Sequence, residues 1–193
     1  MTKENIIIAA LRLFITRGYK SVSLIDVANE VGITKGGIYH YFSSKDALLQ
    51  IGLHHLLDRF EAKYAELMSD KNNIREVLQD LMVEKTPEQY AKDLLGVEGE
   101  YSVDCAHFII EIMGKFPDIQ QRMEAGRVSI CESFAKKIEA AMDTGEINGG
   151  FDSYALAANI IAMANGQISL GSHFQSRAVR QRMMDNVWML LHV

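Results

Sequence analysis

The chain has 193 residues, 48% hydrophobic and 23% charged, a composition typical of a folded globular protein and not of a disordered one. Its two prolines permit long helices, and its two widely separated cysteines support neither a zinc site nor a disulfide framework. The formal net charge is −5, yet the first 50 residues hold six Lys and Arg against four Asp and Glu, which suits a protein that meets an anionic partner with one end only.

The sequence shows no sign of a membrane segment. Residues 6–15 are apolar but include Arg12, and no run reaches the roughly 18 apolar residues that a membrane span requires. The first residues also lack the basic opening and the cleavage site of a signal peptide. We therefore expect a cytoplasmic protein without a membrane partner, in which Cys105 and Cys131 are small core residues.

The first predicted helix begins near Lys3 and stops at Gly18. Between them, Ile7, Leu11 and Phe14 follow one another at spacings of four and three residues, which is the period of a helix with one apolar face. We expect that face to be buried.

A second and a third helix follow, separated by a turn of about three residues. The second begins at Ser23, whose hydroxyl can cap the backbone N–H of Asp26 while the Asp26 carboxylate reaches back, an arrangement called a capping box. Gly32 supplies the positive φ that the end of this helix needs, and Thr34 caps a very short third helix that ends near Tyr41. The expected buried face of the second helix consists of Leu24, Val27, Ala28 and Val31.

The rest of the sequence also predicts helices. Ser43, with Asp46 three residues later, repeats the capping pattern ahead of a long helix from Lys45 to about Met68. Strand patterns have little support, so the predicted fold class is all-α. Further helices are expected at about 72–84, 87–95, 101–115, 118–143, 152–173 and 176–191.

Two short helices joined by a tight glycine turn, after one supporting helix, form the arrangement of a helix-turn-helix DNA reader. Ile33 and Ile38 anchor the second short helix, so that its other face protrudes. Gly36 and Gly37 each cost about 1 kcal/mol in helix propensity, and close approach to a DNA groove is the compensating reason that we infer. The protruding residues are Thr34, Lys35, Gly36, Gly37, Tyr39 and His40.

Residues 18–49 resemble the DNA-binding signature of the TetR family of transcriptional regulators. Gly37 departs from the family pattern, because the family more often has Ala, Ser or Thr at this position. The positions that comply are Gly18, Tyr19, Ser23, Val27, Ala28, Gly32, Ile33, Thr34, Gly36, Ile38, Tyr39, Phe42, Ser44, Lys45 and Leu48.

The resemblance implies that the partner is double-stranded operator DNA, and it implies a role for each protruding residue. The residues placed against bases are Thr34, Lys35 and Gly37, and those placed against phosphate are Tyr39 and His40. Those placed at helix starts, where they pin the backbone, are Ser23 and Lys45. We expect Tyr41 and Phe42 in the core beside Ile38, where they would join the reading helix to the next helix.

The resemblance further implies a DNA-binding domain over residues 1–46 and a larger helical domain over residues 47–193, which dimerises through its last two helices and holds a small ligand. The broad apolar face of those helices predicts a homodimer interface formed by Leu156, Ile160, Met163, Val179, Met183 and Val187, with small alanines that permit close packing. The candidate pocket for a small apolar or amphipathic effector is lined by Met82, Tyr90, Tyr101, Cys105, Phe108, Met113 and Phe116.

Other classes of function find less support. HExxH, a glycine-rich phosphate loop and GxSxG are absent, and Cys105 and His107 point in different directions on a helix, so we expect no enzyme, metal site or cofactor. Two functions stay open: a repressor that a small effector releases from its operator, and a DNA-bound structural or cell-division factor that recruits a protein partner. A closed apolar cavity would favour the first, and a filled core beside an exposed apolar patch would favour the second.

Overall fold

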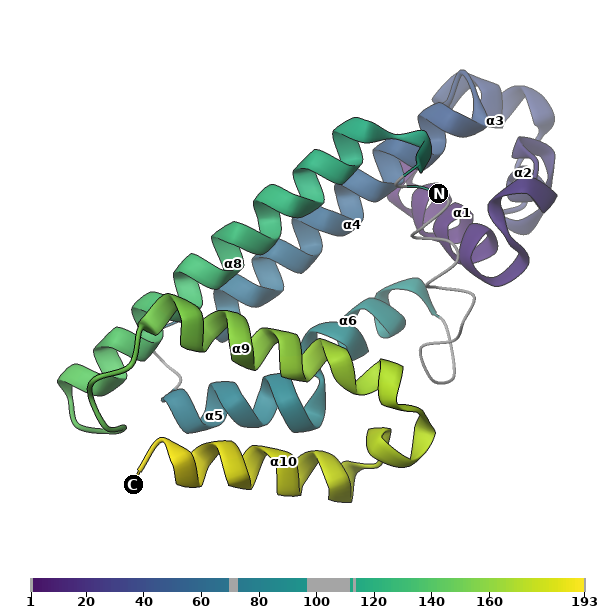
Figure 1. The fold of residues 1–193 in the computed structure, drawn as a ribbon. Coiled ribbons are helices and arrows are strands. Elements are labelled where there is room, and N and C mark those ends of the chain that lie inside the picture. The colour runs from purple at the N-terminus through teal and green to yellow at the C-terminus, as the bar shows by residue number, and fades with distance from the viewer. Residues whose placement is uncertain (1, 70–72, 97–111, 113, 193) are drawn as a thin grey trace. The chain divides into compact units, whose positions relative to one another are not determined.

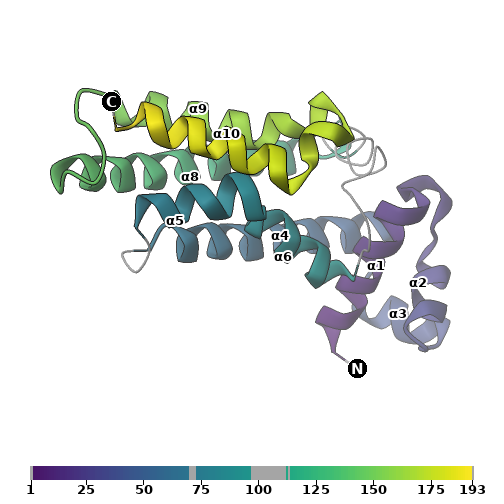
Figure 2. The same cartoon turned by 90° about the horizontal axis from the view of Figure 1, so that it is seen from below.

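The computed structural model describes residues 2–69, 73–96, 112 and 114–192, and every regular element in these ranges is helical (Figures 1 and 2). The predicted all-α fold class is therefore confirmed. The α-helices are α1 (Lys3–Arg17), α2 (Leu24–Glu30), α3 (Lys35–Tyr41), α4 (Lys45–Leu67), α5 (Ile74–Gln79), α6 (Thr86–Leu95), α8 (Pro117–Asp143), α9 (Ser153–Gly166) and α10 (Arg177–Leu190). The shorter turns are 3₁₀ turns at Tyr19–Ser21, Gln167–Leu170 and Ser172–Gln175 and a π-helical turn at Asp80–Glu84.

The chain packs as two compact units. The first unit combines Met1–Arg59 with Tyr90–Glu124, and the second combines Phe60–Gln89 with Ala125–Val193. Helices α4, α6 and α8 each contribute residues to both units. From the sequence we expect a DNA-binding domain over residues 1–46 and a larger helical domain over residues 47–193. That functional boundary stays a prediction.

The first unit has its own hydrophobic core, formed where α1, α2 and α3 gather around the N-terminal end of α4 (Figure 1). Phe14, Val27, Ile38 and Phe42 have at most 1% of their surface exposed, as does Leu49 on α4. The apolar spacing of the first two helices thus predicted the buried faces correctly, except that Val31, just after α2, is half-buried. A helix as short as α3 depends on such packing, because one or two turns of isolated helix are not stable in water.

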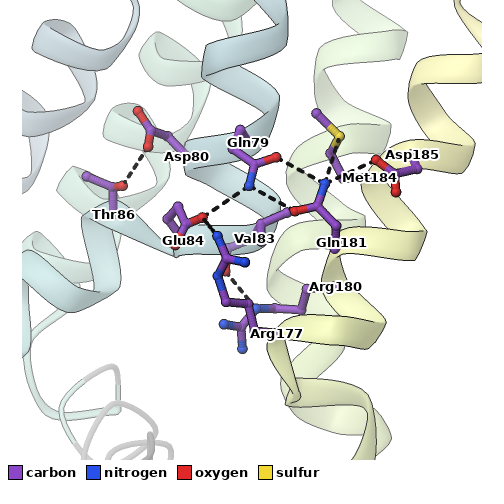
Figure 3. Close-up of polar contacts among 10 residues, drawn as sticks. All are labelled: Gln79, Asp80, Val83, Glu84, Thr86, Arg177, Arg180, Gln181, Met184 and Asp185. Atoms are coloured by element: carbon purple, nitrogen blue, oxygen red, sulfur yellow. Dashed lines mark hydrogen bonds and ion pairs between the residues drawn. The ribbon is translucent and has the colours of Figure 1, made fainter.

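The second unit has a separate core to which its helices α5, α8, α9 and α10 contribute. A polar contact ties α10 to α5 and to the π-helical turn (Figure 3): Gln79 Nε2 donates to Gln181 Oε1 over 3.0 Å, and Gln181 Nε2 donates back to Gln79 Oε1 over 3.2 Å. Glu84 of the π-helical turn forms an ion pair with Arg177 at the start of α10. These contacts fix the position of α10 along the axis of α5.

Several predicted helix ends are wrong by a residue or more. The helix expected from residue 72 begins after the capping box of Asn73 and Glu76 and widens into a π-helical turn at residue 80. The helix expected over 152–173 ends at Gly166, and two 3₁₀ turns follow it with Gly171 between them at a φ of +91°. Most of the helix expected over 101–115 lies outside the described residues.

The cap of α4 also differs from the prediction. Ser44, not Ser43, caps this helix: the backbone N–H of Ala47 donates to Ser44 Oγ over 3.0 Å. The Asp46 carboxylate accepts hydrogen bonds from Tyr19 and Lys115 instead of reaching back to a cap. Ser43 and Ser44 are adjacent, and either could be the cap of α4 by sequence pattern alone. The long-range partners of Asp46 are what distinguish the two possibilities.

Gly32 forms the turn between α2 and α3, as the sequence predicted. Its φ is +71°, in the left-handed region that residues with a side chain rarely adopt, and the N–H of Ile33 donates to the carbonyl of Ala28 over 2.9 Å to close the turn. An added Cβ at Gly32 would meet no atom within 4 Å, so any cost of a side chain there is backbone strain alone.

We predict that Gly32→Ala lowers the free energy of unfolding by about 1 kcal/mol, since an L-residue in the left-handed region is strained by roughly that amount. Urea titration followed by circular dichroism measures this. Gly149→Ala is the matched control, because Gly149 has neither a positive φ nor an atom within 4 Å of the new Cβ. Equal unfolding midpoints for the two variants would contradict the assignment of strain to Gly32.

Candidate nucleic-acid interface

Helix α3 is capped and anchored so that one face stays outside. The N–H of Gly37 donates to Thr34 Oγ1 over 3.1 Å, which is the cap that the sequence predicted, and Ile38 is fully buried beneath the helix. Thr34, Lys35 and Gly36 are exposed. The first turn of α3 therefore faces solvent with the free N–H groups of a helix N-terminus.

The two glycines of α3 differ in what the chain itself requires of them. A Cβ added at Gly37 would lie 3.3 Å from Thr34 Oγ1, so a side chain there would crowd the cap. A Cβ added at Gly36 would meet only Thr34 Oγ1, at an ordinary 3.9 Å, and the φ of Gly36 is not positive. Packing within the chain thus gives no reason for glycine at position 36, whereas close approach of an outside surface would.

Farther along α3, Tyr39 and His40 are exposed as expected, Tyr39 with 48% of its surface. The expectation that Tyr41 lies in the core is wrong, because 43% of its surface is exposed and its ring lies against His40, with centroids 5.6 Å apart. Phe42 is 1% exposed and confirms the other half of that prediction. By helical spacing both residues fall near the face of Ile38, and Phe42 enters the core from the C-cap position, where the backbone leaves the helix with a φ of −139°.

A hollow of about 430 Å³ lies beside α3, at the N-terminal ends of α2 and α4. The capping serines Ser23 and Ser44 both line it, together with Tyr39. Helix N-termini carry partial positive charge and unpaired N–H groups, so a hollow between two of them suits an anion such as phosphate. Its complete lining is Lys20, Ser21, Val22, Ser23, Leu24, Tyr39, Ser43, Ser44 and Lys45.

Ser23 and Asp26 form the predicted capping box. The N–H of Asp26 donates to Ser23 Oγ over 3.2 Å, and Asp26 Oδ2 accepts from the Ser23 hydroxyl over 2.6 Å and from the Ser23 N–H over 2.7 Å. The hydrogen bonds from Ser23, the side-chain bond first, lower the pKa of Asp26 below its ordinary value of 3.8. The carboxylate thus stays ionised while it closes the start of α2.

Lys45 is engaged within the chain. Its Nζ donates to the carbonyl oxygens of Tyr19 and Val22 over 2.8 Å each and lies 4.2 Å from the centroid of the Tyr19 ring. Because residues 20–24 line the hollow, this contact fixes the backbone that forms its wall. A direct contact of Lys45 with DNA stays a prediction.

The candidate effector residues are spread over both units. Met82 is fully buried in the core of the second unit, whereas Phe116 lies in the core of the first, and Tyr90 is half-buried on α6 within the first. The other four candidates, Tyr101, Cys105, Phe108 and Met113, lie outside the described residues. Cys131 is buried, as expected of a small core residue.

The six residues expected at a dimer interface separate into two groups. Ile160 and Val187 are buried in the core of the second unit, with 0% and 9% of their surface exposed, and a place for them at a dimer interface stays a prediction. Their apolar character serves the core, which a sequence pattern cannot distinguish from an interface. Met163 is exposed on α9, and the half-buried residues are Leu156, Val179 and Met183.

Within the described ranges, no three His, Cys, Asp or Glu side chains are grouped so that they could hold a metal ion. The same ranges contain no helix that combines the length and the apolar character needed to cross a membrane.

Residues 6–50 match the model of a family described as bacterial regulatory proteins, tetR family. Over 111 residues the chain is 32% identical to the HTH-type transcriptional regulator YerO of Bacillus subtilis, a match that covers 58% of this chain and 35% of that protein. Over 168 residues it is 26% identical to the HTH-type transcriptional regulator TtgR of Pseudomonas putida, which covers 86% of this chain and 78% of that protein. The match to YerO thus spans about a third of that relative's length.

A solved structure has the same fold over nearly the whole chain. The TetR-family transcriptional regulator from Cytophaga hutchinsonii superposes with a TM-score of 0.71 at 18% identity, and the alignment covers 97% of this chain and 92% of that chain. At this identity the likeness concerns the fold alone. The residues that the family model matches, 6–50, include α2, α3 and the beginning of α4.

We predict that the contribution of Asp26 to stability depends on pH. Because the folded pKa of Asp26 lies below 3.8, ionised Asp26 favours the folded state, so its contribution is complete above that value and disappears as pH falls through the lowered folded pKa. The difference in Tm between the wild-type chain and Asp26→Asn, measured from about pH 6 to about pH 2.5 to span the usual carboxyl range, should shrink as the pH falls. A constant difference would show that the ionised form is not favoured.

Proposed function

Because the chain belongs to the TetR family of transcriptional regulators, we propose that it is a sequence-specific DNA-binding regulator that acts as a homodimer on operator DNA. We further propose that it is a repressor, which a small effector releases from its operator. Such a protein works in the cytoplasm, where bacterial DNA lies. Its relatives reported above are transcriptional regulators by name.

The observation that carries this proposal is the exposed first turn of α3. The cap and the buried Ile38 hold the helix in place, and Gly36 leaves its backbone bare without any internal need for glycine. A major groove admits a helix, and bare backbone permits the closest approach of N–H groups to bases and phosphates. The hollow beside α3 then lies where the adjacent phosphates would run.

We assign each DNA contact from the position of the residue on α3 or beside it. The residues in the first turn of α3 that face bases are Thr34, Lys35 and Gly37, and Gly36 leaves the backbone bare for close approach to DNA. Residues farther along the helix and beside the hollow contact phosphate or hold the wall against which phosphate rests: Ser23, Tyr39, His40 and Lys45. Two copies place their reading helices in successive major grooves, about 34–36 Å apart, which predicts a palindromic operator.

The homodimer forms through the exposed face of α9 together with α10. Met163 supplies an exposed apolar side chain there, and Ala158 and Ala162 on the same helix are exposed and small, so a second copy could approach closely. Leu156, Val179 and Met183, half-buried in one chain, would complete the contact.

The effector is a small apolar or amphipathic molecule bound in the larger domain. This part of the proposal rests on the family resemblance alone. By linkage, an effector that weakens DNA binding is itself bound less tightly when DNA is present. Its identity would follow from screening compounds for release of the selected duplex.

We predict that two substitutions on α3 both weaken DNA binding but differ in their effect on sequence preference. Tyr39→Ala should weaken binding to all duplexes alike, because phosphate contacts carry no sequence information, and Lys35→Ala should cost about 1–3 kcal/mol on the preferred duplex and relax the preference. Selection from a random duplex library followed by fluorescence anisotropy measures both. Lys136→Ala on α8 is the control for loss of one charge. An unchanged selection profile for Lys35→Ala would refute its role, and a wild-type chain that selects no sequence would refute the proposed function.

We predict that Met163→Glu dissociates the dimer, since a buried unpaired carboxylate at a two-fold axis is placed against its own copy. Sedimentation velocity should show a monomer for this variant at concentrations where the wild-type chain is a dimer. Val128→Glu, on an exposed apolar residue of α8, is the matched control and should remain dimeric. If Met163→Glu stays dimeric, α9 is not the interface.

A further inference from the structure

A cluster of four side chains in the first unit adjoins the hollow through Lys45, which lines it. Tyr19 is 5% exposed, and its ring has two ammonium groups beside it: Nζ of Lys45 lies 4.2 Å and Nζ of Lys115 lies 4.5 Å from the ring centroid. Asp46, in the first turn of α4, accepts hydrogen bonds from the Tyr19 hydroxyl and from Lys115 Nζ, the latter over 2.6 Å. Lys115 Nζ also donates to the Tyr19 hydroxyl over 3.2 Å.

Lys115 differs from the other three members by its place in the chain. Tyr19, Lys45 and Asp46 belong to the segment that carries α3, whereas Lys115 lies 69 positions after Asp46, just before α8. Ile112 and Phe116 on either side of it are buried in the core of the first unit. These buried neighbours therefore hold the backbone of Lys115 in place, and its side chain extends from there to the cluster.

The cluster controls both the shape and the charge of the hollow. Lys45 donates to the carbonyl oxygens of Tyr19 and Val22, and residues 20–24 line the hollow, so the contact of Lys45 with the Tyr19 ring connects that ring to the wall. Asp46 adjoins Lys45 in sequence and has about half of its side chain exposed. An unpaired carboxylate there would lie well within a Debye length of a phosphate in the hollow and would repel it.

We propose that Lys115 is a positioning residue for DNA binding: by neutralising Asp46 and bracing Tyr19, it keeps the hollow in the shape and with the charge that a DNA phosphate requires. This inference rests on the proposed function. It assigns to Lys115 no contact with DNA, so Lys115 acts only through Asp46 and Tyr19. A direct contact of its ammonium with phosphate is a different hypothesis, and the two predict different results.

The test is a double-mutant cycle on the full chain, with a mixed-sequence duplex of roughly 30 base pairs at low salt as the probe, because phosphate binding is independent of sequence. Lys115→Met should weaken binding roughly fivefold, the usual upper worth of a half-exposed ion pair, and Lys115→Arg should restore it. In an Asp46→Asn background, Lys115→Met should have less than about half of that effect. Lys136→Met on α8 is the control for loss of one positive charge.

A second measurement needs no DNA. If Lys115 braces the wall, Lys115→Met should speed amide hydrogen exchange in residues 19–24 severalfold, and Lys136→Met should not. Unchanged exchange in this segment would overturn the inference, as would equal losses of affinity with and without Asp46, which would indicate direct contact with phosphate.

The two proposals can fail separately. A wild-type chain that binds the duplex while Lys115→Met binds it equally well overturns the inference and leaves the proposed function intact. A wild-type chain that does not bind any duplex overturns the proposed function and, with it, the role of Lys115.

Discussion

The structure of the first unit depends on the attachment of one short helix by two buried side chains. Ile38 and Phe42, four residues apart, insert one face of α3 into the core, and the Thr34 cap fixes its first turn. A seven-residue helix has little stability of its own, so this attachment determines where the helix lies. Since core packing uses only that face, Lys35, Tyr39 and His40 on the rest of α3 remain exposed. That exposure is what a reading helix needs.

Local interactions explain which parts of this arrangement could be predicted from the sequence. Ser23 with Asp26, Thr34 with Gly37, and the positive φ of Gly32 each involve residues within a few positions of one another, so the pattern of residues determines them. Two predictions were wrong: the burial of Tyr41 and the identity of the serine that caps α4. Each depends on which of two neighbouring residues meets a distant partner. The contact of Lys115 with Asp46 has no local signal at all and required the fold.

The second unit illustrates a different limit. Helices α9 and α10 are apolar on more than one face, and a sequence pattern cannot say which face a single chain buries and which a second chain covers. The structure assigns Ile160 and Val187 to the chain's own core and leaves Met163 outside. The π-helical turn at residues 80–84 was likewise invisible in the sequence, because an inserted residue does not interrupt the run of apolar positions that predicts a helix.

Electrostatics connects these observations to function. An acidic chain with a net charge of −5 must present a surface that DNA does not repel, and the surplus of two positive charges in its first 50 residues is small. The four carboxylates of that segment, however, are each engaged. Their partners are Arg59 for Glu4, Ser23 for Asp26, Arg12 for Glu30 and Lys115 for Asp46. Two of these cations come from outside the segment, so the surface around α3 is more favourable to phosphate than the sequence count suggests, and the fold itself supplies the difference.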